Sequence, residues 1–338
     1  MSSADLYAFH LISAPAGIPV SESHPLERRC VFNAEAQRSA EDAEDNRPAL
    51  DVLWLRPPVA LCAFVRIRGP VSCLPFYYRF MPQTALITGA SSGIGLELAR
   101  IFARNHCDLI LVARESDRLR QAAEDLQQLS GTQPRVIPRD LADPQSPHGI
   151  HAELAGVPVD YLVNNAGFGL GGPFSAMDRQ TGLDMIQVNV TSLVDLTRLF
   201  LPAMLVRKSG RIMNVASTAA FQPGPLMAIY YATKAFVLSF TEAIAEELTG
   251  SGVTVTALCP GPTASDFQRR AAIEHVKLVK NKSLGMMSSR AVAEIGYRGM
   301  MQGKVIVIPG IMNKLGVQSL RLGPRAIVRK AARKLQES

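Results

Sequence analysis

From residue 84 onward, short apolar segments alternate along the chain with segments of helical periodicity. Most of the apolar segments are continuous rather than alternating, as is typical of strands buried on both faces of a parallel sheet. The segments GIGLELARIFARN and SFTEAIAEELTG are two of the helices expected between them. The pattern predicts an α/β fold: a doubly wound parallel sheet of seven strands with right-handed crossovers. The strands are expected at 84–88, 108–113, 135–140, 159–165, 211–217, 253–259 and 304–309.

The chain changes character at Met81. Residues 1–80 show little sustained periodicity, scattered prolines and an acidic patch, AEDAEDNRP. We predict that they form a poorly structured, dispensable extension, which an upstream start codon or an unstructured tail would both explain. The folded, chemistry-bearing domain is expected at 81–310, and residues 311–338 are expected to form a basic amphipathic helix that is broken near Gly323.

The C-terminal helix has two interpretations. It is either a solvated surface helix or a weak peripheral contact with an anionic membrane, with basic residues beside an apolar face. No run approaches the roughly 18 to 20 apolar residues of a membrane span, so no transmembrane segment is expected. The N-terminus lacks a basic start followed by an apolar stretch, and acidic residues argue against a transit peptide. The membrane contact would use Leu320, Leu322, Ile327 and Val328.

Composition excludes several classes of protein. With 47% hydrophobic and 19% charged residues among 338, the chain is globular rather than disordered. Its formal charge of +7 does not indicate nucleic-acid binding, because the basic residues gather between Lys314 and Lys334 and not around aromatics. The five cysteines form no disulfide framework, which fits a cytoplasmic protein. His148 and His151 lack companion ligands, so no metal site is expected.

The first candidate for chemistry is the turn TGASSGIG, from Thr88 to Gly95. It lies between the first predicted strand and the first predicted helix. Glycines there allow a tight turn and a close approach to a pyrophosphate, while the helix N-terminus offers free N–H groups. This strand–turn–helix context indicates a dinucleotide site.

The end of the second predicted strand would contact the adenosine ribose of such a dinucleotide. An acidic residue at this point suits a free 2′-hydroxyl, whereas a basic residue suits a 2′-phosphate. The strand ends at Ala113 and is followed by Arg114. Because arginine can bind a phosphate through two hydrogen bonds, the sequence predicts NADP(H) rather than NAD(H).

The motifs then occur in a characteristic order. TGASSGIG is followed by DLA at Asp140, NNAG at 164–167, Asn189 in VNV, Ser217 in NVAS, YYATK and CPGPT. With these residues the sequence resembles the classical short-chain dehydrogenases/reductases over about Met81 to Pro309. The resemblance implies a single Rossmann-like domain with a seven-stranded parallel sheet, in agreement with the hydrophobic pattern.

The resemblance also implies roles for individual residues. Two positions depart from the family pattern: Ser92 stands where many NADP-dependent members have a basic residue, and Ser265 stands where a threonine is usual, which keeps a hydroxyl. The implied catalytic residues are Asn189, Ser217, Tyr230 and Lys234. With the turn and the arginine, the cofactor-binding set becomes Gly89, Ser91, Ser92, Gly93, Ile94, Gly95, Arg114, Asp140, Leu141, Asn165, Ala166, Gly167, Tyr230, Lys234, Pro260, Gly261 and Thr263.

Two adjacent tyrosines precede the lysine in AIYYATK. On a helix, Tyr230 and Tyr231 can both reach Lys234, so geometry alone does not choose between them. The family pattern has the tyrosine four residues before the lysine and thirteen after the serine, which only Tyr230 satisfies. An ammonium at about 4 Å would supply about 4 kcal/mol and lower the pKa of a tyrosine by up to about three units before desolvation. Tyr231 is expected to be a packing or interface residue.

The expected function is an NADP(H)-dependent oxidoreductase that interconverts a carbonyl and an alcohol by hydride transfer, with Tyr230 as acid or base. The alternative is a non-catalytic NADP(H)-binding regulatory protein, which would need the glycine turn but no proton donor.

The segment 264–288 predicts an apolar pocket for a hydrophobic or lipid-like ketone. Its apolar residues are Phe267, Ile273, Val276, Leu278, Val279, Leu284, Met286 and Met287. By the resemblance, a homodimer or homotetramer is expected through helices near 182–208 and 230–250.

Overall fold

The computed structural model describes residues 82–273, 276 and 286–337. The predicted extension at 1–80 lies outside these residues and stays a prediction. The same holds for three of the expected pocket residues, Leu278, Val279 and Leu284.

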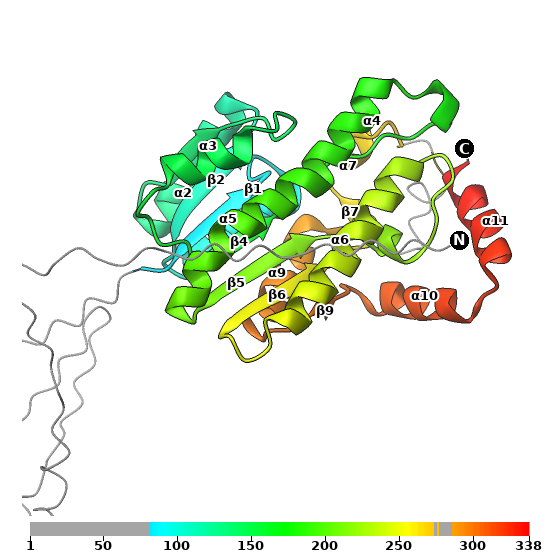
Figure 1. Cartoon of the computed structure of the whole chain (residues 1–338). Helices are drawn as coiled ribbons and strands as arrows, with labels where there is room; N and C mark the ends of the chain where they lie inside the picture. The colour runs from blue at the N-terminus through cyan, green and yellow to red at the C-terminus, as the bar shows by residue number, and fades with distance from the viewer. Residues whose placement is uncertain (1–81, 274–275, 277–285, 338) are drawn as a thin grey trace, which may run out of the picture. The chain divides into compact units, whose positions relative to one another are not determined.

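A parallel sheet of seven strands, in the order β3-β2-β1-β4-β5-β6-β9, forms the centre of the fold (Figure 1). Every neighbouring pair of its strands is parallel. Each predicted strand region overlaps one of these strands, so the predicted α/β fold is confirmed. A second ladder pairs two short segments that hydrophobicity did not reveal, β7 (Thr263–Ala264) and β8 (Met287–Ser288). The seven strands are β1 (Thr84–Thr88), β2 (Asp108–Ala113), β3 (Arg135–Pro138), β4 (Tyr161–Asn164), β5 (Gly210–Val215), β6 (Val253–Leu258) and β9 (Ile306–Val307).

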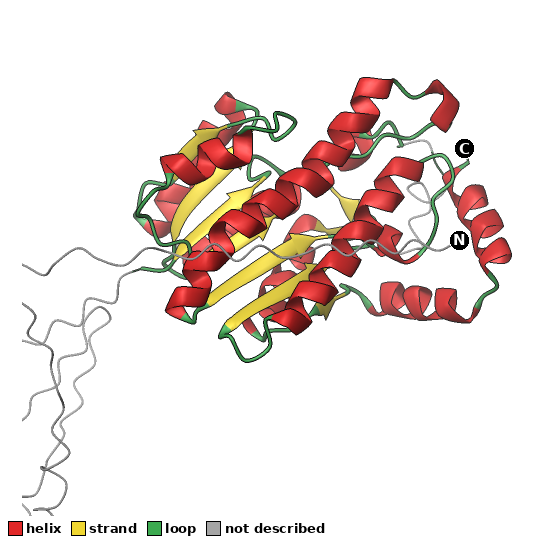
Figure 2. Ribbon diagram, in the orientation of Figure 1, coloured by secondary structure: helices red, strands yellow, loops and turns green. Residues whose placement is uncertain are grey.

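Helices cover both faces of this sheet, which explains why its strands are apolar at successive positions (Figure 2). In β1, Ile87 packs in one buried cluster with residues of α1, α2 and α9, whereas Leu86 faces a second cluster with residues of α3 and α5. The helices are α1 (Gly93–Arg104), α2 (Ser116–Ser130), α3 (Ser146–Glu153), α4 (Arg179–Ile186), α5 (Ser192–Arg207), α6 (Ala228–Glu247), α7 (Phe267–Arg270), α9 (Ser289–Met301), α10 (Ile311–Leu322) and α11 (Arg325–Gln336).

The helical segments α4 and α5 are joined by a π-helical turn, Gln187–Thr191, into one continuous rod. This rod, Arg179–Arg207, has 29 residues and a mean hydropathy of 1.3 over its most apolar window. By length and composition it could therefore span a membrane, so the expectation that no segment meets this criterion was wrong. A core helix of a globular fold meets the criterion too, and here Leu196 and Phe200 are buried against the sheet.

The C-terminal run forms two helices instead of one. The break predicted near Gly323 is confirmed, because α10 ends at Leu322 and α11 begins at Arg325. Pro324 precedes the first residue of α11, where its missing N–H costs no helical hydrogen bond. On α11, Ala332 and Gln336 are buried, and they fix the side of the helix that faces the domain.

Candidate active site

A cavity of about 520 Å³ lies where the carboxyl ends of the central strands meet. In an open parallel sheet this edge is the usual place for a ligand. The glycine turn and the loops after β2, β4, β5 and β6 line the cavity, and so do residues of α6, α7 and α11. The cavity therefore brings together segments from nearly the whole length of the described domain.

The glycine turn between β1 and α1 is shaped for a close backbone approach. Gly89 and Gly93 have φ angles of 65° and 60°, in the left-handed region that favours glycine. A Cβ at Gly95 would overlap the carbonyl oxygen of Gly89 and the side-chain amide of Asn165. Asn165 fixes the turn from the other side, since its Nδ2 donates hydrogen bonds to the carbonyls of Thr88 (2.9 Å) and Gly89 (3.2 Å).

The N-terminus of α1 fits an anion. Ser92 precedes the helix and makes no capping hydrogen bond, and the first turn contains no acidic residue. The first N–H groups of α1 are thus left for a ligand, and the helix dipole favours a negative charge there. Ser91, Ser92 and Ile94 line the cavity at this point, so the residues present fit the pyrophosphate of a dinucleotide.

Arg114 follows the end of β2 and is exposed at the rim of the cavity. The neighbouring carboxylate, Glu115, is engaged by two other arginines: Arg118 at 3.2 Å and Arg270 at 3.2 Å. No ion pair of Arg114 occurs among the described residues. The negative charge beside it is therefore balanced by other residues, and its guanidinium remains available for a phosphate.

The part of the cavity predicted to flank the adenine is fixed by loop hydrogen bonds. Asp140 accepts a hydrogen bond at Oδ1 from the backbone N–H of Ala142 (3.0 Å), and its carbonyl accepts one from the Ser146 hydroxyl (2.6 Å). Leu141 is buried next to it. Asn165, Ala166 and Gly167 continue the cavity wall toward the catalytic residues.

Asn189 lies in the π-helical turn and is almost fully buried. Its Oδ1 accepts a hydrogen bond from the backbone N–H of Phe168 (3.0 Å). Its Nδ2 donates to the carbonyl of Phe168 (2.9 Å) and to the hydroxyl of Thr233 (3.1 Å). The side chain thus ties the loop after β4 to α6, the helix that carries Tyr230 and Lys234.

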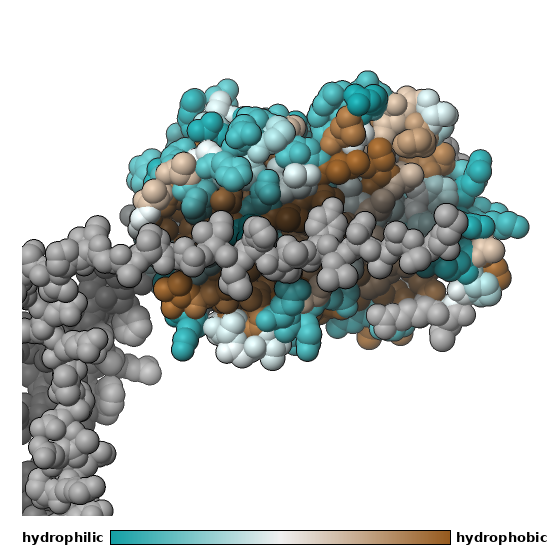
Figure 3. Space-filling model, in the orientation of Figure 1, coloured by the Kyte–Doolittle hydropathy of each residue, from teal (hydrophilic) through white to brown (hydrophobic). Residues whose placement is uncertain are grey.

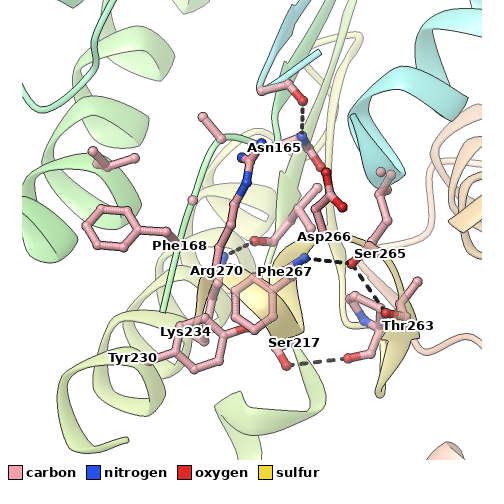
Figure 4. Close-up of a pocket in the computed structure, with 18 of the residues that line it drawn as sticks. Asn165, Phe168, Ser217, Tyr230, Lys234, Thr263, Ser265, Asp266, Phe267 and Arg270 are labelled. Carbon is pink, nitrogen blue, oxygen red and sulfur yellow. Dashed lines mark hydrogen bonds between the residues drawn. The ribbon is translucent and has the colours of Figure 1, made fainter. Parts of the chain in front are cut away.

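Ser217 and Tyr230 face the same part of the cavity (Figure 4). The Ser217 hydroxyl accepts a hydrogen bond from the backbone N–H of Ala219 (3.1 Å) and donates one to the carbonyl of Pro260 (3.4 Å). Burial raises the pKa of the Tyr230 phenol above its ordinary value, and Ser217, as a hydrogen-bond partner, opposes that rise. The phenol is therefore protonated at neutral pH, as a proton donor must be.

Lys234 is buried and lies next to Tyr230. Its Nζ donates a hydrogen bond to the carbonyl of Val215 (2.7 Å) and stands 5.9 Å from the centre of the Tyr230 ring. Burial lowers the pKa of Lys234 to about 8. The lysine was expected to lower the pKa of Tyr230, but in this structure burial raises that pKa, and the opposing contribution comes from the hydrogen bond to Ser217 and not from the lysine.

The loop after β6 holds the far end of the cavity. Pro260, Gly261 and Thr263 line the cavity, and the Thr263 hydroxyl donates a hydrogen bond to the carbonyl of Gly261 (2.9 Å). The Ser265 hydroxyl accepts a hydrogen bond from the backbone N–H of Phe267 (3.3 Å) and donates to the carbonyl of Thr263 (3.3 Å) (Figure 4). These bonds fix the turn that leads into α7.

Several residues around Tyr230, the predicted acid or base, are apolar. The Phe267 ring packs on the Tyr230 ring with their centres 5.3 Å apart. Met227, Ile273 and Val276 are buried in the same cluster. Of the two methionines predicted in this segment, Met286 is exposed and Met287 is partly buried.

Tyr231 is buried, and its ring lies nearly perpendicular to that of Tyr230, at 6.1 Å between centres. Its hydroxyl accepts a hydrogen bond from Nε2 of Gln336 (2.6 Å). The prediction that Tyr231 has a packing role agrees with this position. Gln336 itself was missed, since it lies 105 residues further along the chain and no motif marks it. Arg270 was missed as well, although its place in α7 beside the cavity pairs it with Glu115.

Comparison with known proteins gives one family. The sequence model described as short chain dehydrogenase matches residues 83–275. The ketoacyl reductase HetN from Nostoc sp. is 33% identical over 181 residues, which are 53% of this chain and 63% of that protein. A very-long-chain 3-oxoacyl-CoA reductase from Bos taurus is 33% identical over 185 residues, 54% of this chain and 59% of that one. The chain thus covers less than two thirds of the length of either relative.

Among solved structures, a short-chain dehydrogenase from Sphingobium yanoikuyae in complex with NADPH is similar over nearly its whole length. The TM-score is 0.64 at 32% sequence identity, and the match covers 74% of this chain and 98% of that one. The described domain therefore corresponds to the full fold of that protein.

Proposed function

The chain belongs to the short-chain dehydrogenase family, and we propose that it interconverts a carbonyl and an alcohol with NADP(H), using Tyr230 as the acid or base. One observation carries this proposal: Ser217, Tyr230 and Lys234 share a single cavity with a glycine turn that is shaped for a dinucleotide. A protein that only sensed the cofactor would need the turn but no proton donor beside it. For this reason the non-catalytic regulatory protein is the weaker alternative.

The cofactor, when bound, supplies or accepts the hydride. The open N-terminus of α1 would hold its pyrophosphate, and Arg114 would pair with the 2′-phosphate. Arg114 supports NADP(H) over NAD(H) because Glu115, its neighbour, is already paired with Arg118 and Arg270. The NADPH bound in the related Sphingobium structure is consistent with this choice.

Side chains of the cavity would bind the substrate oxygen and transfer a proton to or from it. Ser217 would give up its long hydrogen bond to the Pro260 carbonyl (3.4 Å) and donate to the substrate's carbonyl oxygen as negative charge develops on it. Tyr230 would donate its proton to that oxygen, so that a hydride and a proton together convert the ketone into an alcohol. In the reverse direction Tyr230 would accept the proton, and a charged Lys234 beside it would stabilise the phenolate.

Asn189 has a positioning role in this proposal. Its side-chain atoms bond to Phe168 and Thr233, and so they hold α6 against the loop after β4. The contacts of Asn189 support a role in fixing the distance between Lys234 and the cavity wall.

The proposed substrate is a hydrophobic or lipid-like ketone. Met227, Phe267 and Ile273 surround the catalytic tyrosine with apolar surface. Relatives named ketoacyl reductase and very-long-chain 3-oxoacyl-CoA reductase are consistent with such a substrate. Small polar ketones and sugars would leave this surface without a partner.

A homodimer or homotetramer stays a prediction, as does a cytoplasmic location. Figure 3 shows apolar side chains gathered over the part of the surface formed by α4, α5 and α6. Phe236 is 43% exposed on α6, and its ring stacks on that of Phe240 at 5.9 Å. Leu183 and Ile186 add exposed apolar surface on α4. A second copy of the chain would cover these residues, and light scattering would give the mass of the assembly.

The proposed function is tested by following NADPH absorbance with a panel of carbonyl compounds. We expect oxidation of NADPH with hydrophobic ketones, slower oxidation with small polar ketones, and a strong preference for NADPH over NADH. Tight NADPH binding without turnover of any carbonyl compound would favour the regulatory protein instead.

A further inference from the structure

The last turn of α11 reaches the active-site cavity. Gln336 is only 5% exposed although it stands two residues before the end of the chain, and it lines the cavity together with Tyr230 and Tyr231. In Figure 1, α11 lies beside the segment that leads into α6, the helix of the two tyrosines. A segment remote in sequence thus contributes to the substrate end of the cavity.

The contact between α11 and α6 is a buried polar bond. Nε2 of Gln336 donates to the hydroxyl of Tyr231 at 2.6 Å. Ala332, one turn earlier, is 3% exposed and packs on the same side of α11. The opposite side of the helix is exposed and basic, with Lys330 and Lys334. Only one side of α11 therefore touches the domain, and Gln336 lies at the end of that side.

Tyr231 offers a rigid partner for this bond. Gly224 lies so close to the Tyr231 ring that a Cβ there would overlap it. The ring also packs in a cluster with Met227 and Ile273. Because the phenol cannot swing away, its hydroxyl holds the Gln336 amide at a fixed place in the cavity wall.

The hydrogen bond to Tyr231 leaves other hydrogen-bonding groups of the Gln336 side chain unused. A glutamine side chain has two N–H donors and one acceptor oxygen, and a tyrosine hydroxyl both donates and accepts. Among the described residues, the Gln336 side chain has one hydrogen bond, the one to Tyr231. A buried amide with unused hydrogen-bonding groups favours a ligand that completes its hydrogen bonds.

We propose that Gln336 determines substrate specificity: with Tyr231 it fixes α11 as the end wall of the substrate chamber and binds a second polar group of the substrate. The chemical class is a bulky apolar ketone that carries a hydroxyl or a further carbonyl away from the reacting carbonyl. This inference rests on the proposed function, since the reacting carbonyl must lie at Tyr230. The ring centres of Tyr230 and Tyr231 are 6.1 Å apart, and Gln336 lines the same cavity. One substrate molecule can therefore place its reacting carbonyl at Tyr230 and a second polar group at Gln336.

The test compares two hydrophobic ketones of equal length, one with a hydroxyl at the end remote from the carbonyl and one without. Gln336→Leu keeps the volume of the side chain but removes the amide. It should raise KM for the hydroxylated ketone about tenfold, as expected for the loss of one buried hydrogen bond. KM for the plain ketone should stay the same or fall, and kcat and the Kd of NADPH should not change.

Tyr231→Phe and Lys334→Ala complete the set of variants. Tyr231→Phe removes the partner of Gln336 and should raise KM for the hydroxylated ketone in the same way. The double variant should then be no worse than either single one, because both remove the same pair. Lys334→Ala alters an exposed residue of the same helix turn and should change neither KM. Equal changes of KM for the two ketones would overturn the specificity role.

A second measurement does not depend on turnover. Amide hydrogen exchange across 325–336 should be slow in the wild-type protein and faster in Gln336→Leu, because the end of α11 loses its attachment. Unchanged exchange in that variant would contradict the proposal that Gln336 holds α11 in place as the end wall of the cavity, even if the enzyme is active. If no ketone is reduced but exchange does respond, then the proposed function has failed and α11 still closes the cavity.

Discussion

The two halves of the cavity are built in different ways. On the cofactor side, the turn from Thr88 to Gly95 works mainly through its backbone, with glycines at positive φ and free N–H groups at the start of α1. On the substrate side, the walls are side chains from distant parts of the chain, among them Met227, Phe267 and Gln336. A motif in sequence can describe the first half but not the second.

The difference has a physical reason. A tight turn that approaches a pyrophosphate needs glycine at particular positions, because any Cβ would collide with the backbone. An apolar wall needs only volume and hydrophobicity, which many residues supply. The cofactor side should therefore respond sharply to small changes, and the substrate side should respond gradually.

The sharpest test of this contrast is Gly95→Val. A Cβ at Gly95 would overlap the carbonyl of Gly89 and the amide of Asn165, so the turn must deform. We expect at least a hundredfold weaker NADPH binding, together with a loss of stability above about 2 kcal/mol. Calorimetric titration and thermal unfolding measure the two effects.

Gly316→Val is the matched control for that change. A Cβ at Gly316, in α10, would meet no atom within 4 Å, and this variant should bind NADPH normally. If Gly95→Val bound NADPH within twofold of the wild type, the turn would not approach the cofactor as closely as we propose.

The sequence was sufficient for the parts that depend on local patterns. Continuous apolar runs located all seven strands, since both faces of the sheet are buried. The motifs located Ser217, Tyr230 and Lys234, which the fold brings into one cavity. Gln336 could not be found in this way, because an amide near a chain end resembles any solvated residue until α11 is folded back onto Tyr231. The raised pKa of Tyr230 was missed for a related reason: spacing predicts the neighbouring lysine but not the extent of burial.

Arg114→Ala sharpens the comparison within the cofactor side. Its guanidinium is proposed to pair with the 2′-phosphate of NADPH, which NADH lacks. Because the residue is exposed, we expect KM for NADPH to rise about tenfold while KM for NADH changes less than twofold. Arg120→Ala, at an exposed arginine of α2, should leave both KM values unchanged. Equal effects of Arg114→Ala on the two cofactors would show that the arginine only supports its loop.

Lys234 gives a pH test of the buried region between the two halves. Burial lowers its pKa from 10.5 to about 8. Below pH 8 the lysine is charged in both states, so the full free-energy cost of burying its charge lowers the stability of the folded state. Between pH 8 and 10.5 the unfolded chain binds more protons at this group than the folded one, so its contribution to stability rises with pH. The slope is at most about 1.4 kcal/mol per pH unit.

Urea unfolding at several pH values, without cofactor, measures this slope. The stability of the wild type should rise between pH 8 and 10 relative to Lys234→Met, which has no group that titrates there. The difference reports the lysine together with its interaction with Cys259, whereas a group such as Cys107 titrates in both proteins. Parallel pH curves would mean that Lys234 is charged and well solvated.

The smallest effect is expected outside the cavity, on α10 and α11. Ile311 and Leu315 on α10 and Ile327 on α11 are 74%, 59% and 62% exposed, and basic residues flank them. If this surface docks on lipid, the protein should sediment weakly with anionic vesicles at low salt and not with neutral ones. Ile327→Asp should abolish sedimentation, whereas Val206→Asp, at an apolar residue of α5 that is 86% exposed, should not. Equal sedimentation of both variants would leave α11 as a solvated helix.

The central claim is that Tyr230, and not its neighbour Tyr231, transfers the proton. Tyr230→Phe keeps the ring that packs on Phe267 and removes only the hydroxyl. The decisive measurement is kcat for a plain hydrophobic ketone, with the Kd of NADPH measured in parallel. We predict that Tyr230→Phe lowers kcat at least a thousandfold with unchanged NADPH binding, and that Tyr231→Phe keeps kcat within about threefold. If Tyr231→Phe lost kcat while Tyr230→Phe kept it, the assignment of the proton donor, and with it the role of Lys234, would be wrong.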